Sequence, residues 1–178
     1  MKLGLRLAAC LALLVAAAEA QAQPTEQAVK AAFIPKFARY VQWPAGLHPG
    51  PREPFQLCVV GHDPFGALLD RAAAGEQVEG RPVGVRRLPD PARLDGCHLA
   101  FVHGDDAGET RRMLLAMRNR PVLTITDARA GSARGMIHFT VAGGRVRFFI
   151  DQAEAEARGL SISSRLLALA LGVRQRRS

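Results

Sequence analysis

The sequence lacks the residue patterns by which most catalytic and metal sites are recognised. No two histidines are spaced as His-x-x-x-His, and no Cys-x-x-Cys pair occurs, so no metal site is predicted. There is no Gly-x-Gly-x-x-Gly or Gly-Lys-Ser/Thr motif for a nucleotide, and no Gly-x-Ser-x-Gly motif for a serine nucleophile. We therefore expect no catalytic residue, no metal and no cofactor, and a protein that is not an enzyme.

Long apolar runs are also absent, apart from one near the N-terminus. That run covers residues 7–18, about a dozen residues, whereas a membrane-spanning helix needs about 20. Lys2 and Arg6 precede it, and small residues at the spacing of a cleavage site follow it. Residues 1–20 are therefore predicted to be a signal peptide, with cleavage after Ala20 or, in a second register, after Ala22. We expect the mature chain to be soluble and to work in a bacterial periplasm.

Lysine is nearly absent from the mature chain, whose positive charge is carried by arginine. Removing residues 1–20 leaves Lys30 and Lys36 as the only lysines, and 22 basic against 15 acidic residues, a net charge of +7. Strong basicity is typical of nucleic-acid-binding proteins, but an exported protein does not routinely meet nucleic acid, and the arginines are spread along the chain. We expect no nucleic-acid partner. The charge is interpreted as a solubilising surface or, alternatively, as a face for anionic lipid or an acidic partner.

Cysteine is scarce, with Cys58 and Cys97 the only two in the mature chain. In an oxidising compartment an even number favours one disulfide. The bridge would close a loop of about 40 residues and stabilise the fold by about 4 kcal/mol. Facing residues of adjacent strands lie about 5 Å apart, which suits a bridge. The alternative is a pair of buried thiols in neighbouring strands.

What is present is a regular alternation of strand and helix patterns, which predicts one α/β domain over residues 25–173 and a basic tail at 174–178. A first helix is expected over 25–43, capped by Thr25, with a kink or break near 32–35 because Pro35 removes a backbone hydrogen bond. Strands are expected at 55–60, 83–88, 98–103 and 121–126, with helices at 64–74 and from about 105 to 119. This order predicts a Rossmann-like, mostly parallel sheet with helices on both faces.

The pattern changes after residue 135. Strands at 136–141 and 145–150 flank Gly143-Gly144, a two-residue loop typical of a β-hairpin. A short helix at 151–158, an extended segment at 160–163 and a final helix at 165–172 are expected to follow. We therefore predict a C-terminal β-hairpin added to the parallel sheet.

The loop at residues 61–66 is the strongest candidate for a binding site. Ligands of parallel sheets bind at the carboxyl ends of strands where the topology reverses, and a helix N-terminus there offers free amide donors. The candidate ligand residues are Gly61, His62, Asp63, Gly66 and Asp127. Asp63, Asp127, His103 and Asp105 could also imitate an acid–base site. The alternative is that the aspartates only cap turns and helices, with Pro64 at the first helical position.

A series of short segments resembles the YfiR-like family of periplasmic proteins in order along nearly the whole mature chain. Each segment is weak alone, but the ordered set is specific. The segments are 29–33, 37–44, 57–66, 80–83, 97–98, 123–127, 135–137 and 160–167.

The resemblance implies a Rossmann-like α/β fold and a regulatory role without catalysis. Characterised members of the family repress an inner-membrane diguanylate cyclase by binding its periplasmic sensor region, and an outer-membrane lipoprotein can sequester the repressor. Repression lowers cyclic-di-GMP and biofilm formation. The alternative is a periplasmic ligand-binding or sensory module that acts with another membrane regulator, such as a histidine kinase. Exposed apolar residues would favour a homodimer.

Three features depart from the family. Its members can carry a second cysteine pair associated with redox sensing, but residues 128–150 contain no cysteine, so a switch through that pair is not expected. Phe149 replaces a glutamate that is common in the second hairpin strand, which puts any partner contact of that glutamate in doubt. Pro35 replaces an aromatic or polar residue in the first helix.

Overall fold

The computed structural model describes residues 23–47, 50 and 53–176, so the expected signal peptide lies outside the described residues. The helices are α2 (Glu26–Phe37), α3 (Ala67–Ala74), α4 (Ala107–Ala116), α5 (Gln152–Ala157) and α6 (Ser164–Leu167). The strands are β1 (Val41–Gln42), β2 (Phe55–Gly61), β3 (Gln77–Val78), β4 (Arg81–Leu88), β5 (Leu99–His103), β6 (Leu123–Asp127), β7 (Ile137–Ala142), β8 (Arg145–Asp151), β9 (Ser161–Ile162) and β10 (Gly172–Arg174). In this part of the chain no helix is long and apolar enough to cross a membrane.

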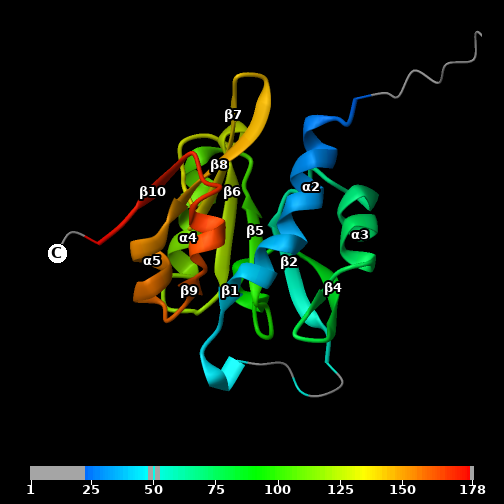
Figure 1. The fold of residues 1–178 in the computed structure, drawn as a ribbon, viewed down its shortest axis with the longest axis vertical. Coiled ribbons are helices and arrows are strands. Elements are labelled where there is room, and N and C mark those ends of the chain that lie inside the picture. Colours follow the sequence, from blue (N-terminus) through cyan, green and yellow to red (C-terminus); the bar gives the residue numbers. More distant parts are fainter. Residues whose placement is uncertain (1–22, 48–49, 51–52, 177–178) are drawn as a thin grey trace, which may run out of the picture.

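An eight-stranded, mostly parallel sheet lies at the centre of this mixed α/β fold, in the order β10-β8-β7-β6-β5-β2-β4-β3 (Figure 1). The five adjacent strands β4, β2, β5, β6 and β7 are parallel. At the edges, β3 runs antiparallel to β4, β8 runs antiparallel to β7, and β10 is parallel to β8. β1 and β9 form a separate antiparallel pair. The apolar runs of β2, β5 and β6 explain their central place, because parallel strands are covered on both faces.

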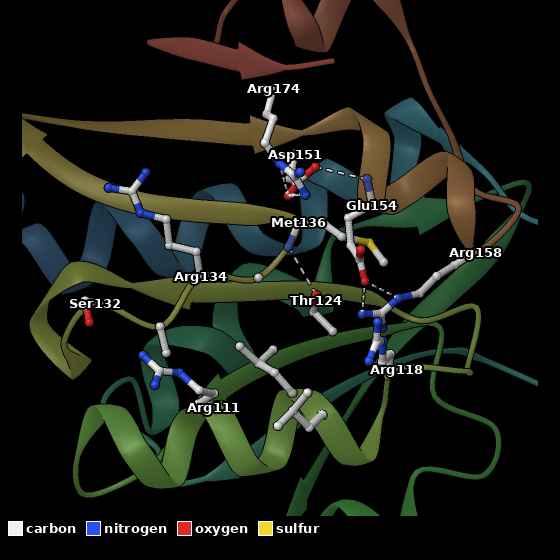
Figure 2. A pocket seen from close by; sticks show the side chains of 14 residues that line it. Arg111, Arg118, Thr124, Ser132, Arg134, Met136, Asp151, Glu154, Arg158 and Arg174 are labelled. Carbon is white, nitrogen blue, oxygen red and sulfur yellow. Dashed lines mark hydrogen bonds and ion pairs between the residues drawn. The ribbon is translucent and has the colours of Figure 1, made fainter. Parts of the chain in front are cut away.

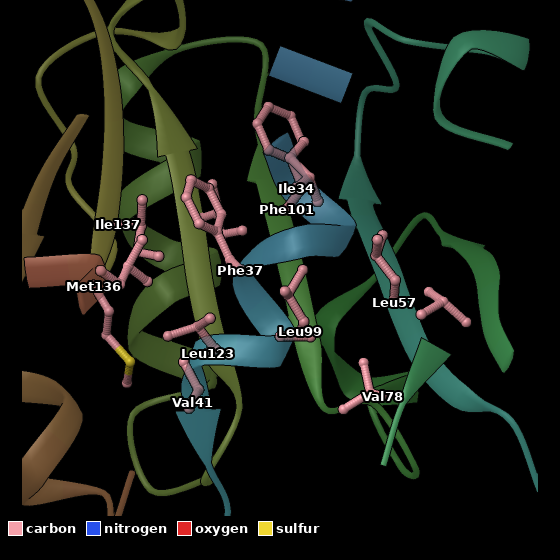
Figure 3. Close-up of a cluster of buried hydrophobic side chains, with 14 of the residues drawn as sticks. Ile34, Phe37, Val41, Leu57, Val78, Leu99, Phe101, Leu123, Met136 and Ile137 are labelled. Atoms are coloured by element: carbon pink, nitrogen blue, oxygen red, sulfur yellow. The ribbon is translucent and has the colours of Figure 1, made fainter. Parts of the chain in front are cut away.

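Two apolar cores lie on opposite faces of the sheet. Alternate side chains of β2 and β5 separate them, because successive residues of a strand point to opposite faces. Leu57 and Leu99 pack with Ile34 and Phe37 of α2 in the larger core, which also takes in α3 (Figure 3). Val60 packs with Met113 of α4 in the smaller core.

The expected break in the first helix is wrong, because α2 continues through Pro35 to Phe37. The Thr25 hydroxyl accepts a hydrogen bond from the Ala28 amide (3.2 Å), as expected of its N-cap. Pro35 lies in the last turn, so it removes only one hydrogen bond near the helix end. Burial of the Phe37 side chain, whose ring lies 5.1 Å from that of Phe148, holds this turn in place. The helix also ends earlier than residue 43, in a short 3-10 turn followed by β1.

The structure also differs from the sequence prediction at the end of the chain. The final helix spans only Ser164–Leu167, and Gly172–Arg174 forms β10, which pairs with the edge of β8. A strand of three residues is too short for a period-2 pattern, so the apolar residues that precede it favoured a longer helix. Arg174 therefore lies in a strand and forms an ion pair with Asp151.

β7 and β8 pair antiparallel across Gly143-Gly144, both of which have positive φ (58° and 71°). A two-residue turn with positive φ at both central positions matches the twist of the flanking strands. Further elements follow β8, and β10 covers its outer edge. The antiparallel pair is therefore part of the sheet and does not end the chain.

A disulfide joins Cys58 of β2 to Cys97, which precedes β5, with their Cα atoms 6.0 Å apart. Both cysteines are buried in the smaller core. The parallel pairing of β2 with β5 places Cys58 opposite Ala100, three residues after Cys97. The bridge therefore links the two central strands on the face that α4 covers.

Replacing both Cys58 and Cys97 with alanine should lower the free energy of unfolding by about 4 kcal/mol, because the denatured chain loses a cross-link between residues 39 apart. Urea denaturation followed by circular dichroism measures the change. Wild-type protein treated with dithiothreitol is the control and should unfold at the same lowered urea concentration. An unchanged midpoint in the variant would contradict this role of the bridge.

Candidate functional site

The carboxyl ends of β2 and β5 form the point where the strand order reverses. From β2 the chain crosses to β4 on one side and then returns to β5 on the other. Open α/β sheets bind ligands at such a point. The structure therefore brings the predicted loop at residues 61–66 next to His103, at the end of β5.

Close packing of the two strand ends explains the first glycine of the loop. Gly61 has a φ of 85°, and a Cβ atom there would lie 2.3 Å from the carbonyl oxygen of His103. The same carbonyl accepts a hydrogen bond from the His62 amide (2.8 Å). Only glycine allows the two strand ends to approach so closely, so the fold requires glycine at position 61 whether or not a ligand binds.

Asp63 is engaged by the protein itself. Its Oδ1 atom accepts hydrogen bonds from the amides of Phe65 (2.8 Å) and Gly66 (3.2 Å), and its Oδ2 atom accepts one from Arg87 Nε (2.7 Å). Burial raises the pKa of Asp63, but the hydrogen bonds from Phe65 and Arg87 outweigh it and hold this pKa below its ordinary value. Arg87 also binds Asp70 on α3 (2.8 Å). Asp63 thus fixes the loop to β4 and α3.

His62 and His103 lie side by side at this edge. Their rings lie 5.4 Å apart in an edge-to-face arrangement. Burial, together with the neighbouring His62, lowers the pKa of His103. The Nδ1 atom of His103 is buried and has no hydrogen-bond partner among the described residues.

Asp127 does not join the loop, because it lies at the end of β6, on the far side of β5. Its Oδ2 atom binds Lys30 Nζ (2.5 Å), and its Oδ1 atom accepts a hydrogen bond from the Arg129 amide (3.1 Å). Glu26 binds both Lys30 (2.5 Å) and Arg129 Nε (2.8 Å). The four side chains form a charge-balanced network that holds α2 to the sheet.

The sequence prediction did not single out Glu26, Arg129 or Lys30 of this network, and the most buried of the three is Lys30. Only 1% of it is exposed, which is rare for lysine unless it is paired. Its signal in the sequence is weak: one of two mature lysines, placed four residues after Glu26 in the first helix. Hydrogen bonds from Arg129 and Lys30 lower the pKa of Glu26 to about 2.

No group of three or more histidine, cysteine, aspartate or glutamate side chains is placed to hold a metal ion within residues 23–47, 50 and 53–176. Two aspartates of the possible acid–base site, Asp63 and Asp127, are used in caps and ion pairs. They therefore do not form a common acid–base site with His103 and Asp105.

A second site, the arginine cleft, lies between α4 and the segment at residues 132–136 (Figure 2). The cleft has a volume of about 300 Å³. It is lined by five arginines and two carboxylates, which come from four separate parts of the chain. These residues are Arg111, Arg118, Arg134, Arg158, Arg174, Asp151 and Glu154.

Two of the five arginines are neutralised within the cleft. Arg158 binds Glu154 (2.5 Å) and donates a hydrogen bond to the carbonyl of Met117 at the end of α4 (3.0 Å). Arg174 binds Asp151. The side chains of the other three arginines, at positions 111, 118 and 134, form no ion pair with another described residue.

His138 lies buried beside this cleft, on β7. Its Nδ1 atom is 2.9 Å from the hydroxyl oxygen of Thr126. Burial, followed by the nearby charge of Arg134, lowers the pKa of His138 to about 4. The ring is therefore neutral at physiological pH.

Comparisons with known proteins place the chain by its sequence. The model of a protein family described as YfiR/HmsC-like matches residues 27–171. No curated protein matches. Among solved structures, the chain is similar to the crystal structure of a conserved domain protein from Vibrio cholerae O1 biovar eltor, with 12% identity and a TM-score of 0.46. That match covers 67% of this chain and 55% of the other, so this chain spans about half of that one.

Substituting Lys30 with methionine should lower the free energy of unfolding by about 3–5 kcal/mol, because Asp127 is left buried without its counter-charge. Chemical denaturation measures the change. Lys36→Met is the matched control, since Lys36 is exposed on the same helix, and it should have little effect. Adding Asp127→Leu to Lys30→Met should restore part of the stability, and equal loss in the single and double variants would speak against an isolated charge as the cause.

Acidification should destabilise the protein through His138 before it affects the carboxylates. The folded pKa of about 4 lies below the ordinary value of 6.5, so the unfolded chain takes up a proton first as the pH falls. The stabilisation from a neutral His138 is complete above pH 6.5 and is lost progressively toward pH 4. Urea midpoints measured across this range should fall less steeply for His138→Gln than for the wild type. Parallel curves for the two proteins would contradict the assignment.

Proposed function

Because the chain belongs to the YfiR/HmsC-like family, we propose that it is a non-enzymatic periplasmic regulator that represses an inner-membrane diguanylate cyclase. Repression would lower cyclic-di-GMP in the cytoplasm and so reduce biofilm formation. The observation that carries the proposal is the family match, which extends over residues 27–171 and thus over nearly all of the expected mature chain.

The predicted compartment and the disulfide support this role. A signal peptide at residues 1–20 would deliver the chain to the periplasm, where it can reach the outward-facing region of a membrane enzyme. The buried Cys58–Cys97 bridge suits an oxidising compartment. The proposed partner is the periplasmic region of the cyclase, and an outer-membrane lipoprotein would relieve repression by sequestering the regulator.

Phe149 identifies a part of the surface where partner choice would differ within the family. Resemblance to the family implies a glutamate there, whereas here the guanidinium of Arg134 lies 5.2 Å from the centre of the Phe149 ring. A negatively charged side chain is thus replaced by an aromatic ring, over which the positively charged guanidinium of Arg134 lies. We infer that a partner that contacts this position should present an acidic or apolar group to it.

Deleting the gene should raise cyclic-di-GMP and biofilm formation, because the cyclase loses its repressor. The nucleotide is measured in cell extracts, and biofilm by surface staining. The full-length gene should restore both values, whereas a gene without residues 1–20 should not, because its product stays in the cytoplasm. Unchanged cyclic-di-GMP in the deletion strain would reject the proposal.

A second candidate function is a ligand-binding or sensory module that acts with another membrane regulator, such as a histidine kinase. The unpaired, buried Nδ1 atom of His103 favours it, because an unsatisfied polar atom is costly and a ligand could supply its partner. The proposed ligand residues are those of the loop, Gly61, His62, Asp63 and Gly66, with His103 in place of the more distant Asp127.

A thermal-shift screen with small periplasmic metabolites tests this second candidate. A compound bound at the loop should raise the melting temperature of the wild type but not that of His62→Gln/His103→Gln. The control is His138→Gln, which changes a histidine away from the loop and should keep the shift. A screen without any shift would count against the module.

A further inference from the structure

We propose that the arginine cleft binds a small anion that carries two or more negative charges, of the phosphate or polycarboxylate class. This site differs from the loop at residues 61–66. The charged side chains that line the cleft support this site, so the proposal does not depend on the proposed function.

The wall formed by α4 presents two of the uncompensated arginines in one direction. Arg111, Leu114 and Leu115 line the cleft at helical spacing, and Arg118 follows just after the end of the helix. Residues three, four and seven apart share one face of a helix. The face therefore has a guanidinium toward each end and an apolar patch between them.

The opposite wall is held rigidly by β6. The Gly135 amide donates to the Thr126 hydroxyl (2.8 Å), and the Met136 amide donates to the Thr124 hydroxyl (3.1 Å). A Cβ atom on Gly135 would lie 2.8 Å from the Thr124 carbonyl oxygen, so this segment cannot move closer. Arg134 leaves the chain at this fixed point. A preorganised donor loses less entropy when it binds a ligand.

The contact with Phe149 further orients Arg134. A ring contact of this kind holds the guanidinium in place and leaves its N–H donors available for an acid. In Figure 2, Arg111 extends from the helix, and Ser132 and Arg134 lie above it at the same end of the cleft, with the Arg134 side chain directed upward, away from the helix. Guanidinium groups bind phosphate and carboxylate oxygens through paired N–H donors. These two arginines are therefore the expected primary ligands.

The charge balance of the cleft sets the charge of its ligand. Two of the five arginines are offset by Glu154 and Asp151, which leaves three positive charges from positions 111, 118 and 134. Like charges gathered in a recess repel one another and focus a positive potential there. An anion with two or three charges would remove this repulsion, whereas a single charge would offset only part of it.

The shape of the cleft favours a small molecule over an acidic protein segment. Its volume of about 300 Å³ is at the lower end of the range for small-molecule sites. A second hollow of about 320 Å³, lined by Phe149 and Val173, shares Arg134 and Asp151 with the cleft. The second hollow leaves room for the uncharged part of an organic anion.

Isothermal titration calorimetry of the mature chain with inorganic pyrophosphate and with citrate tests the proposal. We expect binding with a dissociation constant below about 1 mM at low salt, weakening at higher salt as exposed charges are screened. Binding of pyrophosphate alone assigns a phosphate ligand, and binding of citrate alone assigns a polycarboxylate. Equal binding of both indicates that charge and size decide. Each of these three results supports the proposal.

Arg111→Gln/Arg134→Gln should weaken binding about tenfold or more, because each substitution removes charge-assisted hydrogen bonds. Arg145→Gln/Arg165→Gln is the matched control: it removes two exposed arginines outside the cleft and the same net charge. Melting temperatures check that both variants fold. If both variants weakened anion binding equally, the cause would be the overall charge of the protein, and the proposal would be overturned. It would also be overturned if neither anion bound, or if only a poly-glutamate peptide did.

Discussion

Burial of β2, β5 and β6 on both faces is the constraint on which the rest of the structure depends. Since neither face of these strands can stay open to water, α2 and α3 must cover one face and α4 the other. The same burial requires an ion pair that holds α2 against the sheet. Lys30 becomes a buried charge when α2 docks, and it is tolerable there because Asp127 at the end of β6 and Glu26 of α2 both pair with it. On the other face, the disulfide links β2 covalently to the segment that precedes β5.

The parts of the fold that could be predicted from sequence are those with a local cause. Continuous apolar runs predicted the central strands, and the Gly143-Gly144 pair predicted an antiparallel connection. An even number of cysteines, in a chain expected to be exported, favoured the bridge between Cys58 and Cys97. The errors occurred where tertiary contacts decide. Pro35 is tolerated because Phe37 is buried, and β10 exists because β8 leaves an edge that it can pair with. Neither cause is visible within a window of a few residues.

The same distinction applies to the candidate sites. Asp63 was recognisable as a loop residue from its neighbours, and its hydrogen bonds to Phe65 and Gly66 fit the capping alternative. The network around Asp127 joins residues 97 positions apart, and the arginine cleft gathers side chains from α4, the 132–136 segment, α5 and β10. No local motif marks such a convergence. The sequence reveals only that arginine is abundant, which fits a solubilising surface equally well.

The structure divides that abundance into arginines with different roles. Arg87, Arg129 and Arg174 are used in ion pairs that join elements of the fold, and Arg158 forms its ion pair with Glu154 of the same helix. The arginines at positions 111, 118 and 134 form no ion pair with another described residue. Arg174 connects the two groups, because it lines the cleft and also binds Asp151 next to the edge strand β10. An anion in the cleft would compete with Asp151 for this arginine. Since β10 pairs with β8 through only three residues, that competition would act on a weakly paired edge of the sheet. An anion bound in the cleft would therefore act on this edge through a single side chain, Arg174.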